Sequence, residues 1–104
     1  MEITLENVKK LIETSDKLVV LDFGAEWCGP CKTMDKVIKE IKNDFSEKVE
    51  FIGIDVGEHN DIAVNYAIAS GIPKFLFFKK GSQVNVFAGS KSKEDFIKFL
   101  NSML

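Results

Sequence analysis

The stretch Leu18–Lys32, with the sequence LVVLDFGAEWCGPCK, decides how this chain folds. Its beginning, Leu18–Phe23, is an almost continuous apolar run of strand length, which is typical of a strand covered on both faces and central in a parallel-type sheet. After Pro30, apolar residues recur at helical spacing with Lys and Glu between them, at Met34, Val37, Ile38, Ile41 and Phe45. The stretch therefore predicts a buried strand and an amphipathic helix, joined by a short loop that holds Cys28 and Cys31.

Three further helices are predicted, each behind a polar residue that can cap its first turn. Thr4 precedes a stripe of apolar residues at helical spacing, and Asn60 can cap a short helix through Tyr66. Ser92, followed by Asp95, resembles a capping box and opens the last helix.

Three further strands are predicted from runs of apolar residues between turn signals. They lie at Val49–Asp55, Lys74–Lys79 and Gln83–Ala88, and Lys80–Ser82 supplies turn chemistry that joins the last two into a hairpin. Helices and strands alternate up to this hairpin and the helix that follows it. We therefore expect an α/β protein with a mixed sheet, parallel in its first part and antiparallel at one edge.

Length and composition indicate a single globular domain. The chain has 104 residues, of which 45% are hydrophobic, so we expect one domain over residues 1–104. The net charge is −2 and all 14 cationic side chains are Lys, which argues against a nucleic-acid partner. The apolar runs are too short to cross a membrane, and the N-terminus lacks the pattern of a secretory signal. We therefore expect a cytoplasmic protein with no membrane partner.

The two cysteines are i,i+3 neighbours on one face at the start of the predicted helix. A helix N-terminus presents unpaired N–H groups and the positive end of the helix dipole, and both favour a thiolate at Cys28. Cys31 lies deeper in the helix, so we expect it to keep its proton longer and to attack the mixed disulfide that Cys28 forms. Gly29 lets the backbone turn closely, and Pro30 fits the first turn because its missing N–H costs little there.

A structural disulfide and a zinc site are the alternative interpretations of this pair. Closing so short a loop gains only roughly 2 kcal/mol, so stabilisation is a poor reason for the spacing. A zinc ion needs four ligands, and beyond Cys28 and Cys31 the chain offers only His59, in a predicted exposed loop. We therefore favour redox chemistry and expect no metal.

Asp22 is the anomalous residue of the apolar strand. Desolvation disfavours a charged carboxylate, so a strand this apolar should not carry one without a cause. The side chain would point to the same side as Val20 and Gly24, near the strand end that leads to the cysteines. It could be a base for the proton of Cys31 or a strand-end carboxylate that reaches solvent, and the residues alone leave both possibilities open.

The chain resembles the thioredoxin family over essentially its whole length. The residues that carry the resemblance, in order and spacing, are Val20–Phe23, Ala25–Lys32, Gly71–Pro73, Phe77–Gly81 and Gly89. The resemblance implies the thioredoxin fold, in which a central mixed β-sheet of about five strands is flanked by about four helices. It also implies that no separate cofactor is needed, because the Cys28–Cys31 disulfide is itself the redox-active group.

The resemblance also implies roles for individual residues. Cys28 would be the attacking thiol, Cys31 the resolving thiol, and Asp22 the carboxylate that assists proton transfer at the second cysteine. Pro73 would be a cis-proline in a loop that faces the disulfide. A shallow apolar surface for an extended protein substrate would be formed by Trp27, Gly29, Pro30, Gly71, Ile72, Pro73 and Gly89.

Four residues differ from the pattern of the family that the chain resembles. Gly24 stands where an aromatic residue is common, Lys36 where a helix-kinking proline is common, and Lys74 where threonine is common. Asp35, one turn beyond Cys31, adds negative charge near the pair and would disfavour a thiolate modestly. We expect these differences to affect the choice of partners more than the chemistry.

The resemblance implies a general protein dithiol–disulfide oxidoreductase, acting as a monomer, that reduces disulfides in protein substrates and is recycled by thioredoxin reductase. Reduction is the expected direction because Gly and Pro separate the cysteines, where oxidising or isomerising members usually place a His. One alternative is a binding module whose cysteines are incidental, and loss of both cysteines without loss of phenotype would favour it. Another is a dedicated reductant of a single enzyme.

Overall fold

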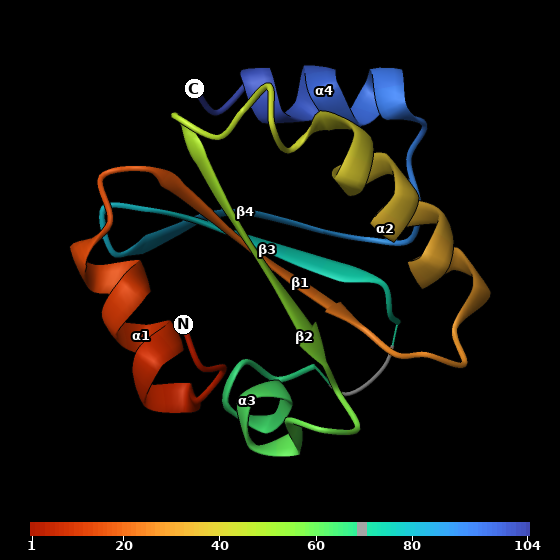
Figure 1. Cartoon of the computed structure of the whole chain (residues 1–104). Helices are drawn as coiled ribbons and strands as arrows, with labels where there is room; N and C mark the ends of the chain where they lie inside the picture. The colour runs from red at the N-terminus through yellow and green to blue at the C-terminus, as the bar shows by residue number, and fades with distance from the viewer. Residues whose placement is uncertain (69–70) are drawn as a thin grey trace.

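The computed structural model describes residues 1–68 and 71–104. A sheet with the strand order β2-β1-β3-β4 forms its centre (Figure 1). The strands are β1 (Leu18–Gly24), β2 (Val49–Asp55), β3 (Lys74–Lys79) and β4 (Ser82–Ala88). β1 pairs in parallel with β2 and antiparallel with β3, and β4 pairs antiparallel with β3. The mixed α/β sheet with an antiparallel edge is thus confirmed.

Helices cover both faces of this sheet. They are α1 (Leu5–Thr14), α2 (Gly29–Ile41), α3 (Asn60–Asn65) and α4 (Lys93–Asn101). Figure 1 shows α2 and α4 on one side of the sheet and α1 and α3 on the other. The four expected helices are therefore present. The sheet has four strands in the described residues rather than about five, because Met1–Thr4 form no strand and α1 already begins at Leu5.

The continuous apolar run of β1 is explained by burial on both faces. Leu18 and Val20 belong to a core with α2 and α4, whereas Val19 and Leu21 belong to a second core with α1 and α3. Alternating side chains of one strand thus enter two different hydrophobic cores. This double coverage fixes β1 in the centre of the sheet and directs its end, Gly24, toward the cysteine loop.

Two of the three expected helix caps are confirmed. The Thr4 hydroxyl accepts the N–H of Asn7 at 3.1 Å, and the Ser92 hydroxyl accepts that of Asp95 at 3.1 Å. The expectation for α3 is wrong, because Asn60 is its first residue and His59 occupies the N-cap position without a side-chain cap.

The turn that precedes α3 accounts for this difference. The carboxylate of Asp55 accepts the N–H groups of Gly57 at 2.8 Å and Glu58 at 3.0 Å, and this local turn brings the backbone into the helix one residue early. His59 was expected to be an exposed loop residue. It is instead the N-cap residue of α3, and its side chain is only 29% exposed.

The β3–β4 hairpin brings the start of β3 and the end of β4 to the end of the sheet where β1 finishes. Its two-residue loop has positive φ at Lys80 (50°) and Gly81 (84°), as the favoured type I′ turn requires. Lys74 pairs with Phe23 of β1 on one side and with Ala88 on the other. The cysteine loop and the segments next to Pro73 and Gly89 therefore meet at this end.

Candidate active site: a cysteine pair at the start of α2

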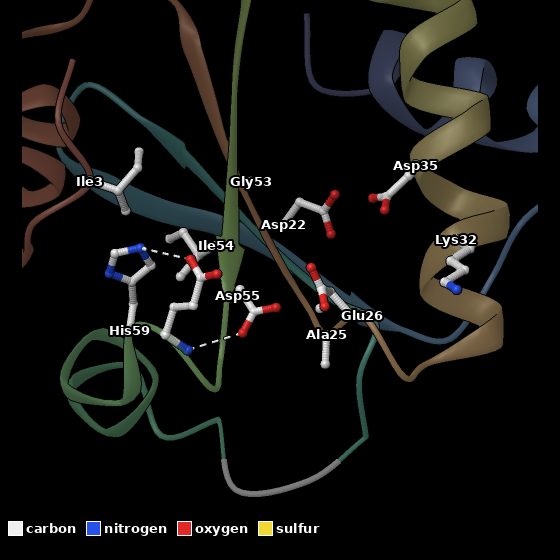
Figure 2. A pocket seen from close by; sticks show the side chains of 12 residues that line it. Ile3, Asp22, Ala25, Glu26, Lys32, Asp35, Gly53, Ile54, Asp55 and His59 are labelled. Atoms are coloured by element: carbon white, nitrogen blue, oxygen red, sulfur yellow. Dashed lines mark hydrogen bonds and ion pairs between the residues drawn. The ribbon is translucent and has the colours of Figure 1, made fainter.

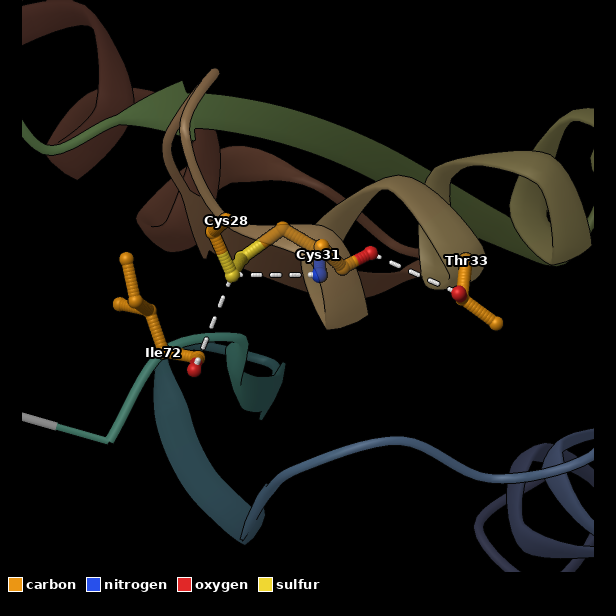
Figure 3. Close-up of a disulfide and its surroundings, with 5 residues drawn as sticks. Cys28, Cys31, Thr33 and Ile72 are labelled. Atoms are coloured by element: carbon orange, nitrogen blue, oxygen red, sulfur yellow. Dashed lines mark hydrogen bonds between the residues drawn. A yellow bond between two sulfur atoms is a disulfide. The ribbon is translucent and has the colours of Figure 1, made fainter.

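Cys28 and Cys31 form a disulfide at the N-terminus of α2 (Figure 3). Cys28 is the N-cap residue, and its Sγ accepts the backbone N–H of Cys31 at 3.2 Å. Gly29 and Pro30 are the first two residues of the helix, so the proline falls where its missing N–H is not needed. The sequence therefore places a sulfur atom where other N-caps place a hydroxyl oxygen.

This position favours negative charge on Cys28 more than on Cys31. An N-cap side chain receives hydrogen bonds from the free N–H groups of the first turn and lies at the positive end of the helix dipole. Both cysteines are buried, with 7% exposure at Cys28 and 3% at Cys31. Reduction of the disulfide would thus leave Cys28 as the sulfur that the helix can stabilise as a thiolate.

The loop before β3 faces the disulfide. The Ile72–Pro73 peptide bond is cis, as the resemblance implied, and Cys28 Sγ lies 3.9 Å from the carbonyl oxygen of Ile72 (Figure 3). The Gly89 N–H donates to the carbonyl of Pro73 at 2.8 Å and so ties the end of β4 to this loop. Segments far apart in the sequence thereby meet at the cysteines.

The expected substrate surface divides into exposed and supporting residues. Trp27 is 80% exposed, although large aromatic side chains are usually buried in a monomer. Gly29, Pro30 and Gly71 are also exposed, and Ile72 and Gly89 are partly exposed. Pro73 is buried, so it can shape the loop but presents little side-chain surface of its own.

Asp22 points from β1 toward α2 into a cavity of about 430 Å³ (Figure 2). It lies on the strand face of Val20 and Gly24, as expected, and its register partner on β2 is Gly53. The pKa of Asp22 is raised from 3.8 to about 7. Burial is the largest cause, and the negative charge of Asp35 and a hydrogen bond with Asp35 contribute the rest. Asp22 therefore exchanges its proton near neutral pH rather than staying ionised like a surface carboxylate.

Gly24 connects this cavity with the cysteines. It lines the cavity, and a Cβ placed on it would lie 3.3 Å from both Cβ and Sγ of Cys31. The strand therefore passes Cys31 so closely, two residues after Asp22, that a side chain at position 24 would crowd it.

The meeting of Asp22 with Asp35 is a feature that the sequence pattern does not predict. Asp35 was expected to act on the cysteines, but its carboxylate lies in the cavity and faces Asp22 (Figure 2). The spacing of Asp35, one turn after Cys31 on the same helix, was the available signal. It could not be read without knowing how α2 lies across β1.

Groups suited to a metal ion are not found in the part of the chain that the structure describes. No three or more His, Cys, Asp and Glu side chains are arranged there to hold one. Among the same residues, no helix is both long and apolar enough to cross a membrane. The chemistry that the site itself carries is the exchange between a dithiol and a disulfide.

A cysteine pair at a helix start, opposite a cis-proline loop on a mixed α/β sheet, defines a dithiol–disulfide oxidoreductase. Comparisons with known proteins agree with this class. A family model described as Thioredoxin matches residues 1–102. The chain belongs to the thioredoxin family, and Cys28–Cys31 is its redox pair.

Individual relatives are similar over most of this chain. It is 34% identical to Thioredoxin of Rickettsia felis over 102 residues, which are 98% of this chain and 96% of that protein. It is 38% identical to Thioredoxin of Bacillus subtilis over 92 residues, 88% of either protein. With Thioredoxin-T of Drosophila melanogaster it shares 40% identity over 84 residues, which are 81% of this chain but about half (53%) of that protein.

A solved structure shares the fold. Its chain superposes with a TM-score of 0.82 at 27% identity, covering 95% of this chain and 90% of its own length. That structure is described as "Structural basis of the thiol resolving mechanism in yeast mitochondrial 1-Cys peroxiredoxin via glutathione/thioredoxin systems". The thioredoxin fold expected from the sequence is thus confirmed.

Proposed function

We propose that this protein is a protein-disulfide reductase with a Cys-Gly-Pro-Cys dithiol, in which Cys28 attacks and Cys31 resolves. The observation that carries the proposal is the N-cap position of Cys28, whose sulfur accepts the N–H of Cys31 at 3.2 Å and faces the loop at Ile72. This is the sulfur that the helix stabilises as an anion, and a thiolate is the form that attacks a disulfide.

The reaction takes place in two exchanges. The Cys28 thiolate attacks one sulfur of a substrate disulfide; a bond from Cys28 Sγ to that sulfur forms, and the other substrate sulfur leaves with the electron pair. Cys31 then loses its proton and attacks Cys28 Sγ, and the bond between Cys28 and the substrate breaks. The substrate gains two electrons and two protons in total, and the protein is left with the Cys28–Cys31 disulfide.

Asp22 is proposed as the acceptor of the Cys31 proton. Its pKa of about 7, raised chiefly by burial, suits a group that takes up and returns a proton near neutral pH. Support also comes from its place on β1, two residues before Gly24, where an added Cβ would lie only 3.3 Å from Cys31 Sγ. A carboxylate without this role would cost stability in such a strand with no compensating gain.

The substrate is proposed to be an extended protein segment beside Cys28. The carbonyl of Ile72, 3.9 Å from Cys28 Sγ, can pair with substrate backbone, and the exposed ring of Trp27 supplies apolar contact. Gly29, Pro30, Gly71 and Gly89 complete a surface with few side chains, supported from below by Pro73. Main-chain recognition of this kind gives a broad choice of substrates.

The remaining proposals concern the setting of the reaction. We infer one domain over residues 1–104, which acts as a cytoplasmic monomer with neither nucleic acid nor membrane as a partner. The net charge of −2 supports the absence of a nucleic-acid partner. Thioredoxin reductase is the proposed donor, since the disulfide form must be reduced again after each turnover.

Trapping of the mixed disulfide tests the proposal. Cys31→Ser should accumulate a covalent adduct with a protein substrate such as insulin, which dithiothreitol releases, because the resolving thiol is absent. Cys28→Ser is the matched control and should form no adduct. An adduct in Cys28→Ser alone would reverse the assignment, and an unchanged phenotype after loss of both cysteines would favour a redox-independent binding module. Supplying thioredoxin reductase and NADPH to the wild-type protein tests the donor.

A further inference from the structure

We propose that Asp35 is a positioning residue whose carboxylate faces Asp22 across the cavity, and that it thereby sets the pH range in which Asp22 can accept the proton of Cys31. This inference rests on the proposed function. It assigns Asp35 an action through Asp22, whereas the sequence suggested only an action on the cysteines.

The geometry brings the two carboxyl groups together from different elements. Asp22 lies on β1 with its side chain toward α2, and Asp35 lies on α2 one turn after Cys31. Both side chains line the same cavity and face each other in it (Figure 2). A negative charge facing Asp22 disfavours the ionised form of its carboxyl group, so Asp22 keeps its proton to a higher pH.

Other charged groups line the same cavity. Glu26 from the β1–α2 loop, Asp55 from β2 and Glu58 from the following turn add negative charge to the cavity. Lys32 of α2 and His59 at the start of α3 are the cationic or titratable groups among the lining residues.

Three of these groups already have other partners. The carboxylate of Asp55 accepts the N–H groups of Gly57 and Glu58, and His59 Nε2 lies 4.0 Å from the Glu58 carboxylate. Asp35 faces Asp22 across the cavity (Figure 2). The pKa of Asp22, raised to about 7 with Asp35 as the cause second to burial, agrees with this arrangement.

The cavity also gives the pair a route for proton exchange. Gly53, the register partner of Asp22, has no heavy atom within 4 Å of the place where a Cβ would lie. Gly53 and Asp22 both line the cavity of about 430 Å³, which is open beside the carboxyl group. A proton taken from Cys31 can thus leave through the cavity without crossing the hydrophobic cores.

The consequence concerns the second exchange only. Cys31 S–H transfers its proton to ionised Asp22, the Cys31 sulfur bonds to Cys28 Sγ, and the substrate sulfur leaves Cys28 with the electron pair. When Asp35 is anionic, Asp22 holds its proton to higher pH, so fewer molecules can start this exchange in mildly acidic solution. The first exchange requires neither carboxyl group.

Single-turnover kinetics with dithiobis(nitrobenzoate) separates the two exchanges. Attack by Cys28 on the reagent releases the first thionitrobenzoate, and attack by Cys31 on the mixed disulfide releases the second. Both rates are measured from about pH 5 to about pH 9 for the wild-type protein, Asp35→Asn and Asp35→Glu. Glu40→Gln, at an exposed position on the same helix, is the control for the loss of one negative charge.

We expect the midpoint of the second phase to fall by roughly one pH unit in Asp35→Asn, with the first phase unchanged. Asp35→Glu should keep the wild-type midpoint, as should Glu40→Gln. Equal shifts in Asp35→Asn and Glu40→Gln, or none in either, would overturn the inference while leaving the proposed function intact. Release of both products at one rate in every variant would instead contradict the assignment of attacking and resolving thiols.

Carboxyl carbon NMR of the disulfide form gives a readout that needs no thiol chemistry. The titration midpoint of Asp22 should fall by roughly one pH unit in Asp35→Asn and stay in place in Glu40→Gln. An Asp22 midpoint that does not move in Asp35→Asn would refute the action of Asp35 on Asp22, whatever the kinetics of the cysteines.

Discussion

The sheet face under α2 has two ends that are built from the same strands in opposite ways. At the apolar end, formed by Leu18, Val20, Val49 and Phe51, side chains pack into the core with α2 and α4. At the cavity end, the next positions on the same two strands hold Asp22, Gly24, Gly53 and Asp55. The pairing of β1 with β2 is continuous across both ends, so the change lies in the side chains alone.

This difference separates stability from chemistry along one strand pair. The apolar end supplies buried area and close packing, which stabilise the fold. The cavity end has fewer apolar contacts and partly shields a carboxyl group from bulk water, which costs stability but tunes proton transfer. Substitutions at the two ends should therefore change the free energy of unfolding in opposite directions.

The largest effect is expected at the apolar end. Phe77 pairs with Val20, is fully buried, and has its ring 5.2 Å from that of Phe99. Phe77→Ala should lower the free energy of unfolding by roughly 3–5 kcal/mol, because it removes apolar contacts and leaves a cavity. Urea denaturation followed by circular dichroism measures this loss. A loss below about 1 kcal/mol would show that the apolar end does not hold the fold together.

Asp22→Asn should have the opposite sign. The folded-state pKa of Asp22 is about 7, above its ordinary 3.8, so the folded protein binds more protons than the unfolded chain between these values and stability falls as pH rises through them. Replacement by neutral Asn should therefore stabilise the protein by roughly 1–3 kcal/mol at about pH 8 and by little at about pH 4. The same variant should slow the second exchange.

Denaturation of both proteins at the two pH values checks this prediction. If Asp22→Asn stabilised the protein equally at both pH values, ionisation of Asp22 would not be the cause of the stabilisation. No gain at either would mean that Asp22 is well solvated and that its proposed role lacks its physical basis.

A matched pair of glycine substitutions probes the cavity end itself. A Cβ at Gly24 would lie 3.3 Å from Cys31 Cβ and Sγ, whereas one at Gly53 would meet no atom within 4 Å. Gly53→Ala should be neutral or stabilising by some tenths of a kcal/mol, since alanine restricts the unfolded chain. Gly24→Ala should be less stable than Gly53→Ala by about 1 kcal/mol, because Cys31 must shift. Equal stabilities would deny the close approach at Cys31.

The smallest effect on the free energy of unfolding is expected at the proposed substrate surface. Trp27 is 80% exposed, so Trp27→Ala should change the free energy of unfolding by no more than about 0.5 kcal/mol. Reduction of insulin by this variant should nevertheless fall several-fold, because an apolar contact with the substrate is lost. Unchanged insulin reduction would remove Trp27 from the proposed substrate surface.

The sequence predicted the parts of the molecule that depend on local patterns. The apolar run of β1 and the helical stripe of α2 are strong periodic signals, and Thr4 and Ser92 cap their helices through contacts only three residues away. The prediction that Asn60 caps α3 was wrong because the Asp55 side chain forms the turn before this helix. The sequence does not show which of two possible local contacts forms.

Features that depend on how distant elements meet were not predicted from the residues themselves. The cis bond before Pro73 came from the resemblance alone, since most such bonds are trans. The pairing of Asp22 with Asp35 depends on how α2 is rotated about its axis above β1. The apolar periodicity shows which face of α2 is buried, but not which of its residues lies over Asp22. The cavity at Gly53 likewise requires the register between β1 and β2.

The central claim is that the N-cap position makes Cys28, and not Cys31, the reactive sulfur. The most direct measurement is the rate of alkylation of each cysteine in the reduced protein by iodoacetamide at neutral pH, with the labelled residue identified by fragmentation mass spectrometry. We predict that Cys28 reacts at least about tenfold faster than Cys31, as a thiolate stabilised by a helix N-terminus should. Equal and slow labelling of the two cysteines would contradict the claim.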